Sequence, residues 1–192
     1  MEVVLRSILP ELLGGAISFE VYSFQGKPDL LGKLSQRLRG YRAWLPETYR
    51  IVVMVDRDDD DCKDLKDRLE RVAADAGLVS RSSAQSGDWQ LVNRIVVEEL
   101  EAWFLGDIEA LRTAFPQIPK TLGQRKQFRD PDAVPGGTRQ ALERVLQRSG
   151  YFKSGLRKIE LARQVSPLLA PEKNRSRSFQ VFCEAINELA EL

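Results

Sequence analysis

The sequence contains no histidine among its 192 residues. Without histidine the chain cannot build a Ser-His-Asp triad, a Cys-His dyad or a histidine-ligated metal site. Cysteine is scarce as well, and its two occurrences, Cys62 and Cys183, do not form a CxxC motif. That spacing argues against a cysteine-based zinc site and favours a reducing cytoplasm over an oxidising compartment.

Long hydrophobic runs are also lacking. No stretch of about 18 apolar residues occurs, so the sequence predicts no membrane span, and the first residues do not indicate a signal peptide. Hydrophobic residues make up 43% of the chain and charged residues 30%, as in ordinary globular proteins. We therefore expect a cytoplasmic protein with one sizeable core.

The formal net charge of +1 conceals an uneven distribution of charge along the chain. Residues 1–119 carry 15 Lys and Arg against 20 Asp and Glu, whereas residues 120–180 carry 14 against 5. The remaining residues, 181–192, carry none against 3. An acidic part therefore precedes a basic part, which favours a metal site beside a phosphate-binding surface, although solvated charges can produce the same pattern.

Hydrophobic periodicity predicts strands that alternate with helices in the first part of the chain. The alternating segment 16–24 and the apolar runs within 50–56 and 89–100 predict strands. The predicted helices cover 1–13 (with a kink or break at Pro10), 28–45, 62–78, 99–115 (broken at Gly106-Asp107), 138–150, 154–169 and 178–192.

This order of strands and helices predicts an α/β fold with a mostly parallel sheet flanked by helices, followed by a helical C-terminal section. We expect an α/β core over 1–115, a long connection over 116–137, and a basic helical section over 138–192 packed on the same domain. One feature is unusual: doubly wound domains usually open on a strand, whereas this chain shows helical periodicity from its first residue.

Two aspartates follow the apolar run IVVMV, at the predicted end of a buried strand. Ligands in open α/β sheets bind beyond the carboxyl ends of the strands. If the strand geometry continues, Asp56 and Asp58 point to the same side, and two carboxylates so placed favour Mg²⁺, Mn²⁺ or Ca²⁺. The alternative is that residues 58–61 cap the next helix and favour its dipole, an interpretation that suits 59–61 best.

A second acidic group follows the next predicted strand. Glu98 and Glu101 are three residues apart and share one face of a helix, whereas Glu99 points elsewhere. If both strands end at one rim of the sheet, four or five carboxylates gather there, which is the geometry of a one- or two-metal site for phosphate esters. The alternative interpretation places these glutamates in the first turn of a helix.

The basic part of the chain supplies charge that is complementary to phosphate. Clustered Arg and Lys side chains bind phosphate backbones, and serines just before the last helix can donate hydrogen bonds to an anion. For most of these residues a solvated surface is the alternative. The residues that we expect to contact substrate are Lys153, Arg157, Arg175, Ser176, Arg177 and Ser178.

Five blocks of sequence, taken in one order, resemble a known family: VDRDDDDCKDLKDRL, NRIVVEELEAWFLGD, FRDPDAVPGGT, GYFKSGLRKIELA and NRSRSFQVF. The family is the bacterial domain of unknown function 4276, and the resemblance covers nearly the whole chain. It implies a Toprim-like fold over the α/β core. In Toprim nucleases of the overcoming-lysogenisation-defect class, a strand-borne Glu and an Asp-x-Asp pair bind Mg²⁺ and act on nucleic-acid phosphodiesters.

The resemblance assigns roles to individual residues. The implied catalytic acids, which also serve as ligands of Mg²⁺ or Mn²⁺, are Asp56, Asp58, Glu98 and Glu101. Glu99 belongs to the same second acidic block. Lys158, or else Lys153, stands where related nucleases place a lysine that stabilises the transition state.

The resemblance also predicts a segment ahead of Met1. Family members resemble a strand that ends in Val-Glu-Glu, followed by a short turn and a Met-Glu that opens the first helix, and this chain begins at that Met-Glu. We therefore expect the first strand and its catalytic-type Glu to be missing, through a misplaced start codon or a trimmed chain. The helical periodicity at the first residue agrees with this expectation.

Together the residues and the resemblance predict a Mg²⁺-dependent Toprim-type nuclease or phosphotransferase that acts on DNA or RNA. The resemblance further implies work beside an ABC-type ATPase in anti-phage defence, since the chain has no GxxxxGK[ST] motif of its own. Two alternatives stay open. One is a non-catalytic module that docks on or regulates the ATPase, and the other is a metal-dependent phosphatase for small nucleotides.

Overall fold

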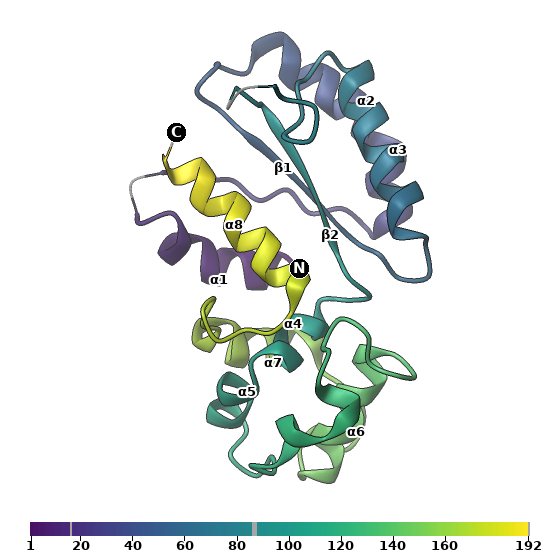
Figure 1. The fold of residues 1–192 in the computed structure, drawn as a ribbon, viewed down its shortest axis with the longest axis vertical. Helices are drawn as coiled ribbons and strands as arrows, with labels where there is room; N and C mark the ends of the chain where they lie inside the picture. The colour runs from purple at the N-terminus through teal and green to yellow at the C-terminus, as the bar shows by residue number, and fades with distance from the viewer. Residues whose placement is uncertain (16, 86–87, 192) are drawn as a thin grey trace. The chain divides into compact units, whose positions relative to one another are not determined.

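The computed structural model describes residues 1–15, 17–85 and 88–191 (Figure 1). The α-helices in this part are α1 (Glu2–Leu12), α2 (Lys27–Trp44), α3 (Cys62–Asp75), α4 (Glu101–Gly106), α5 (Ile108–Ala114), α6 (Thr138–Arg148), α7 (Lys158–Val165) and α8 (Arg177–Glu191). The strands are β1 (Ile51–Asp56) and β2 (Leu91–Val96), and the 3₁₀ helices are η1 (Leu122–Gln124), η2 (Lys126–Phe128) and η3 (Ser166–Leu168). None of the described helices is long and apolar enough to cross a membrane.

The chain divides into two compact units. The strand unit is Tyr22–Val96 and contains α2, β1, α3 and β2. The helical unit joins Met1–Val21 to Val97–Leu192 and contains the other helices. The molecule is therefore an α/β protein with a parallel sheet and a helical C-terminal section.

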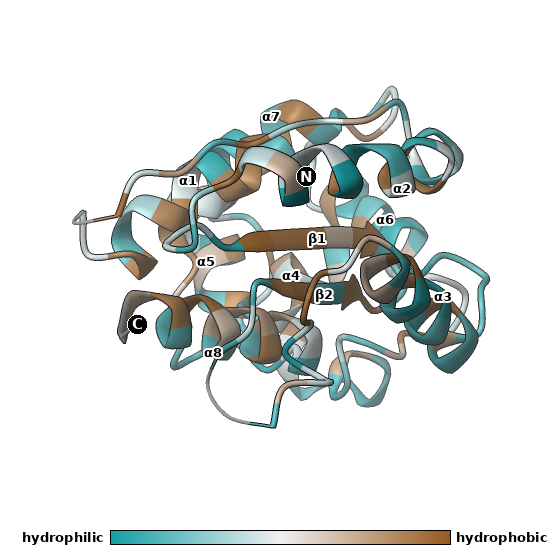
Figure 2. Ribbon diagram, turned by 90° about the horizontal axis from the view of Figure 1, so that it is seen from above, coloured by the Kyte–Doolittle hydropathy of each residue, from teal (hydrophilic) through white to brown (hydrophobic). Residues whose placement is uncertain are grey.

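The strand unit is built on two parallel strands. β1 pairs with β2 in register, and the last residue of β1, Asp56, lies opposite the last residue of β2, Val96. Both strands are hydrophobic along most of their length (Figure 2), as expected for strands covered by other elements. The two strands therefore end level with each other.

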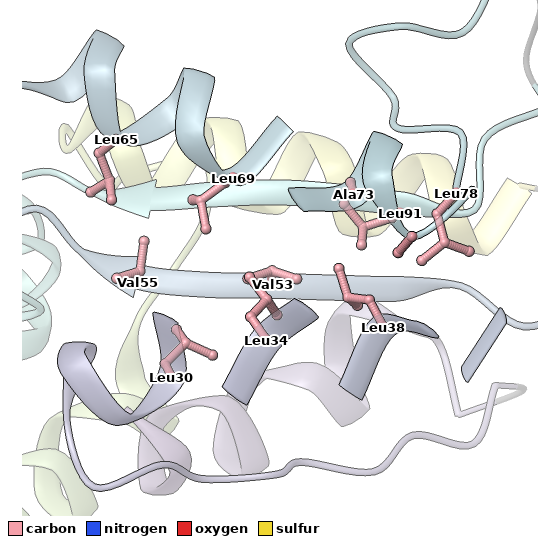
Figure 3. Packing of buried hydrophobic residues seen from close by; sticks show 11 residues of the cluster. Leu30, Leu34, Leu38, Val53, Val55, Leu65, Leu69, Ala73, Leu78 and Leu91 are labelled. Atoms are coloured by element: carbon pink, nitrogen blue, oxygen red, sulfur yellow. The ribbon is translucent and has the colours of Figure 1, made fainter. Parts of the chain in front are cut away.

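Helices α2 and α3 contact each other and share one core with the strands. Their leucines converge on Val53 and Val55 of β1 (Figure 3). The helical side chains in this core are Leu30, Leu34, Leu38, Leu65, Leu69 and Ala73. Each fully buried leucine contributes about 1.5–3 kcal/mol relative to exposure, so this cluster holds β1 in place.

A carboxylate at the edge of this core ties a serine-rich loop to the sheet. Glu70 accepts hydrogen bonds from Ser80 Oγ, from Ser82 Oγ at 3.1 Å and from Asn93 Nδ2 at 3.0 Å, and it pairs with Lys66 Nζ at 2.7 Å. Burial opposes ionisation of Glu70, but these donors outweigh it and lower its pKa to about 2. The charged carboxylate thus fastens α3, β2 and the loop together.

The helical unit combines the first helix with the end of the chain. α1 contacts α7, η3 and α8, and Figure 1 shows α1 beside α8. The face of α1 that is buried consists of Val4, Leu5, Ile8 and Leu9. α1 continues past Pro10 to Leu12, so the predicted break does not occur there; a proline this close to a helix end disturbs few backbone hydrogen bonds.

Trp103 lies at the centre of the helical unit. Its side chain is fully buried. Its ring centroid lies 4.8 Å from that of Phe179 and 5.1 Å from that of Phe182. Contacts of this kind between tilted aromatic rings contribute about 0.5–1.5 kcal/mol beyond the area they bury. They fix α4, which carries part of the second acidic group, against α8.

The predicted strand over 16–24 is wrong for residues 17–24, which contain no strand, and residue 16 lies outside the described residues. The alternation of Ile17, Phe19 and Val21 is real, yet Ile17 is 38% exposed. A lone extended segment needs a neighbouring strand to pair its backbone groups, and none pairs with 17–24. The other predicted elements are confirmed, including the break between α4 and α5.

Candidate active site

The first acidic group lies in the loop that follows β1. β1 ends at Asp56. Asp58, two residues further on, has a φ of +49°, which is the left-handed region that few non-glycine residues adopt. The condition that strand geometry continues to Asp58 is therefore not met, because β1 ends at Asp56 and the backbone at Asp58 is left-handed. We call residues 57–61 the aspartate loop.

A lysine that the sequence reasoning missed neutralises this loop. Lys27 Nζ lies 2.8 Å from Asp58 Oδ2 and 2.8 Å from Asp60 Oδ2, and it donates a hydrogen bond to the Arg57 carbonyl at 2.7 Å. Partial burial opposes the charged form, but the two carboxylates outweigh it and raise the pKa of Lys27. Its ammonium group thus takes the position of a cation among three oxygens.

The rest of the aspartate loop serves the next helix. Asp61 caps α3, since its carboxylate accepts hydrogen bonds from the amides of Lys63 at 2.8 Å and Asp64 at 3.0 Å. These two hydrogen bonds lower the pKa of Asp61. A carboxylate at this position is among the best helix caps, and the capping interpretation is confirmed for Asp61.

The second acidic group begins two residues after β2. Glu98 has a φ of +56°, and a left-handed backbone is costlier for Glu than for Asp or Asn. Its Oε2 accepts hydrogen bonds from the Thr138 amide at 3.1 Å and from Thr138 Oγ1 at 2.5 Å. Glu98 therefore binds the first residue of α6, forty positions along the chain.

Glu101 and Lys158 form the centre of this group. The Glu101 side chain is 5% exposed, and Lys158 Nζ lies 3.1 Å from its Oε1. The same Nζ lies 3.9 Å from Glu99 Oε1. Burial and the charge of Glu101 raise the pKa of Glu99, while Lys158 acts in the opposite sense. We call Glu98, Glu99, Glu101 and Lys158 the glutamate–lysine group.

The other predicted basic residues lie at the surface of the helical unit. Lys153 is exposed. The Arg157 guanidinium lies 5.1 Å from the Phe152 ring centroid and 3.1 Å from Glu160 Oε2. Both Arg157 and Glu160 are largely solvated, so this ion pair contributes little to stability. Lys153 and Arg157 stay accessible to a ligand.

Two further predicted residues, Arg175 and Arg177, flank the start of α8. Arg175 is exposed, and its Nη2 donates to the Phe128 carbonyl at 3.2 Å. Arg177 Nη1 pairs with Glu184 Oε1 at 2.9 Å, with both side chains largely exposed. Neither guanidinium is sealed inside the protein.

The two serines of NRSRSF are buried and already have protein partners. Ser176 Oγ donates to Asp132 at 2.6 Å, and the Ser178 amide donates to the same carboxylate at 2.9 Å. Ser178 Oγ accepts from Trp103 Nε1 at 3.0 Å. In this structure they connect α8 to the 116–137 connection and to α4.

The four predicted metal ligands fall in different units. Asp56 and Asp58 belong to the strand unit, and Glu98 and Glu101 belong to the helical unit. Among the described residues, no three His, Cys, Asp or Glu side chains are gathered closely enough to hold a metal ion. Asp58, Glu98 and Glu101 instead bind Lys27, Thr138 and Lys158. Within each unit, the positions that a cation would take beside these carboxylates are filled by protein donors.

Three contributors to these groups were not predicted: Lys27, Asp132 and Thr138. Neighbouring carboxylates require a compensating cation. The run of aspartates therefore predicted a cation nearby, and in the structure that cation is Lys27. That role was assigned to a metal instead, because Lys27 is thirty residues away and no local pattern links it to the aspartates. Thr138 and Asp132 carry no comparable signal.

Comparison with known proteins gives one match. The model of the family described as "Domain of unknown function (DUF4276)" matches residues 1–187. No curated protein and no solved structure matches the chain at a significant level.

Proposed function

The chain belongs to the family known as domain of unknown function 4276, and we propose that it is a Toprim-like nuclease or phosphotransferase that acts on DNA or RNA with Mg²⁺ or Mn²⁺. The proposal combines the family resemblance of the sequence with the acidic and basic groups described above. The relation to Toprim proteins is part of the proposal.

One observation carries the proposal. β1 and β2 are parallel and end level, and each strand is followed two residues later by an acid with a left-handed backbone, Asp58 and Glu98. Such conformations cost about 1–3 kcal/mol each and cluster at active sites. Ligands of open α/β sheets bind beyond the carboxyl ends of strands. A strained acid at such a position supports a reaction site in the strand unit for Asp58, and the strain at Glu98 supports one in the helical unit.

Lys158 is the best candidate to bind the reacting phosphate. Its side chain is 50% exposed, while its partner Glu101 is almost fully buried. The buried carboxylate fixes the ammonium group and leaves its outer side open to a ligand. A positioned cation stabilises negative charge that develops on a phosphoryl group. Glu99, whose pKa is raised, is the carboxyl group best suited to give or take a proton nearby.

Accessible basic side chains supply contacts to the rest of the substrate. Lys153, Arg157, Arg175 and Arg177 are exposed and belong to the helical unit. Arg and Lys bind phosphates without reading sequence, which suits an enzyme that accepts many nucleic-acid sequences. Ser176 and Ser178 act in this proposal by holding the arginines next to them.

The proposal includes Mg²⁺ or Mn²⁺ because of the carboxylates after the strands and because of the family resemblance. Because Lys27 already pairs with Asp58, binding of Mg²⁺ or Mn²⁺ there requires this pair to open. We derive no catalytic step from the metal for that reason. Lys158 and Glu99 are the groups on which the proposed chemistry rests.

A cleavage assay tests the proposal. Single-stranded and double-stranded DNA and RNA are incubated with the chain and Mn²⁺ or Mg²⁺, and Asp56→Asn is compared with Asp59→Asn. Asp59 is exposed, and its substitution removes the same charge from the neighbouring loop. We expect Asp56→Asn to lower the cleavage rate by about 100-fold, the scale of losing one electrostatic group at a reacting centre.

Equal rates for both variants, with folding checked by circular dichroism, would reject the assignment of Asp56. Cleavage of small nucleotides alone would instead support the phosphatase.

The docking module is favoured by a separate observation. Asp58, Glu98 and Glu101 all have partners within the chain, as expected for carboxylates with a structural role. A module of this kind cleaves nothing with either metal but retains an ABC-type ATPase during co-purification. That pair of results would replace the nuclease with the module.

A further inference from the structure

The helical unit contains a hollow that is not part of the glutamate–lysine group. It is open to solvent and has a volume of about 580 Å³, within the range of pockets that bind small molecules. Its charged lining residues are Asp107, Glu109, Arg112, Lys120, Lys173 and Arg175. Four cations therefore face two acids.

Both acids are already engaged. Asp107 accepts hydrogen bonds through Oδ1 from the Ala110 amide at 2.9 Å and through Oδ2 from the Ala170 amide at 3.0 Å. Glu109 pairs with Lys173 at 3.1 Å, and both of these side chains are more than half exposed. The hydrogen bond that Lys173 donates to Glu109, together with the charge of Glu109, raises the pKa of Lys173, so this lysine is charged at neutral pH.

The other three cations have no acidic partner among the described residues. Arg112, Lys120 and Arg175 form no salt bridge with any carboxylate of the described part of the chain. The Nε of Arg112 is buried and has no hydrogen-bond partner among the described residues. Uncompensated cations that line one hollow favour an anion there.

The backbone around the hollow is fixed. Asn174 Nδ2 donates to the Trp103 carbonyl at 2.8 Å, and the Arg175 amide donates to the Gly106 carbonyl at 3.1 Å. Gly106 allows this contact, since a Cβ there would lie 1.9 Å from Asn174 Oδ1. The segment that carries Lys173 and Arg175 is thus held against α4 before any ligand arrives, which favours binding.

We propose that this basic hollow binds a phosphate or diphosphate group, presented by a free nucleotide or by a nucleic-acid strand. Arg forms paired hydrogen bonds with phosphoryl oxygens, and Lys adds a mobile charge. Arg112 and Arg175 provide the guanidinium groups, and Lys120 and Lys173 provide the ammonium groups. The hollow shares only Arg175 with the residues proposed to contact the nuclease substrate, and none of the proposed catalytic residues lines it, so binding in the hollow is measured separately from cleavage.

Isothermal titration of the full chain tests the hollow. Inorganic pyrophosphate, ADP and a short single-stranded oligonucleotide are titrated separately, without metal. The double variant Lys120→Gln/Arg175→Gln is compared with Arg148→Gln/Arg163→Gln, which removes the same charge from exposed arginines of the helical unit outside the hollow. We expect the first variant to weaken binding about tenfold or more and the control to bind like the unmodified chain.

A second measurement does not require a variant that folds. In the unmodified chain, ¹⁵N-labelled Gly106 and Gly123 line the hollow, so their amide resonances should shift on addition of pyrophosphate. Equal loss of affinity in both double variants, or no binding of any probe, would overturn the proposal. Binding of the oligonucleotide alone identifies a strand as the source of the phosphate, and binding of pyrophosphate and ADP identifies a free nucleotide.

Discussion

Lys27 in the strand unit and Lys158 in the helical unit each pair with two carboxylates, but their settings are opposite. The Lys27 side chain is 17% exposed, and its partners Asp58 and Asp60 are 48% and 51% exposed. The Lys158 side chain is 50% exposed, and its partner Glu101 is 5% exposed. In the strand unit the lysine is enclosed and its two acids face water. In the helical unit the lysine faces water and Glu101 is buried.

Because of this difference in exposure, we expect the two ion pairs to attract ligands of opposite charge. An enclosed lysine with solvated acids is a fixed internal counter-charge, and its carboxylates can still turn toward an external cation. An enclosed acid with a solvated lysine presents a positioned positive charge to the outside. Under the proposed function, we therefore expect the aspartate loop to bind cations and the glutamate–lysine group to bind phosphate.

The largest expected effect on stability comes from removing the exposed lysine. Lys158→Met leaves the buried Glu101 carboxylate without its cation. Because Lys158 is half exposed, water screens part of this pair, and we expect the unpaired Glu101 carboxylate to cost about 1–3 kcal/mol of unfolding free energy. Urea denaturation at neutral pH measures the loss.

Lys27→Met serves as the comparison, because the aspartates that it leaves behind are half exposed. We expect it to cost less than about 1 kcal/mol. Similar losses for the two lysine variants would contradict the distinction between the two groups.

The pair of Lys66 and Glu70 is intermediate in exposure, and the pH dependence of its contribution to stability tests the comparison. Their side chains are 29% and 22% exposed. Because the folded-state pKa of Glu70 lies near 2 instead of 4.5, its contribution to stability is present above pH 4.5 and is lost as the pH falls toward 2. We expect Glu70→Gln to lower the unfolding free energy at neutral pH by about 1–2 kcal/mol.

Unfolding free energies between neutral and acid pH measure this effect. The exposed Glu47→Gln is the matched control in the same unit. The difference between the unmodified chain and Glu70→Gln should shrink as the pH falls; a constant difference would show that ionisation of Glu70 is not the cause.

Cation binding by the aspartate loop tests the other side of the comparison. Removing the Lys27 ammonium with Lys27→Met should increase the affinity of this loop for Mn²⁺ by about tenfold, which corresponds to about 1.4 kcal/mol. Lys33→Met is the control, since Lys33 pairs with Asp29 elsewhere on α2. Isothermal titration measures both, and unchanged affinity in Lys27→Met would separate the loop from metal binding.

The smallest expected effect concerns backbone strain in the second acidic group. Glu98→Ala and Glu98→Gly both lose the hydrogen bonds to Thr138, but only glycine accepts a φ of +56° without strain. We expect the glycine variant to be more stable than the alanine variant by about 1 kcal/mol. Thermal unfolding compares them, and an alanine variant of equal or greater stability would show that Glu98 is not strained.

Features that depend on neighbouring residues were predicted well from the sequence. The apolar run before Asp56 predicted β1, and Asp61 was a recognisable cap because a cap acts on the next few amides. The break at Gly106-Asp107 was predicted for the same reason.

Features that depend on distant pairing were not predictable. Lys27 meets Asp58 across thirty residues, and Glu98 meets Thr138 across forty. Hydrophobic periodicity does not indicate which distant residues will meet in the fold. The strand predicted over 16–24 was wrong for a related reason. Alternating apolar residues show that a segment could bury one face, but they do not show that a neighbouring strand is there to pair with it.

The division of the chain has a consequence for the order of synthesis. The strand unit is one continuous segment, so all of its contacts are available once residue 96 has left the ribosome. The helical unit needs α1 together with α7 and α8, so α1 must wait until these two later helices have been made. During translation its face of Val4, Leu5, Ile8 and Leu9 lacks these partners, which makes α1 the segment most exposed to chaperones and to misassociation.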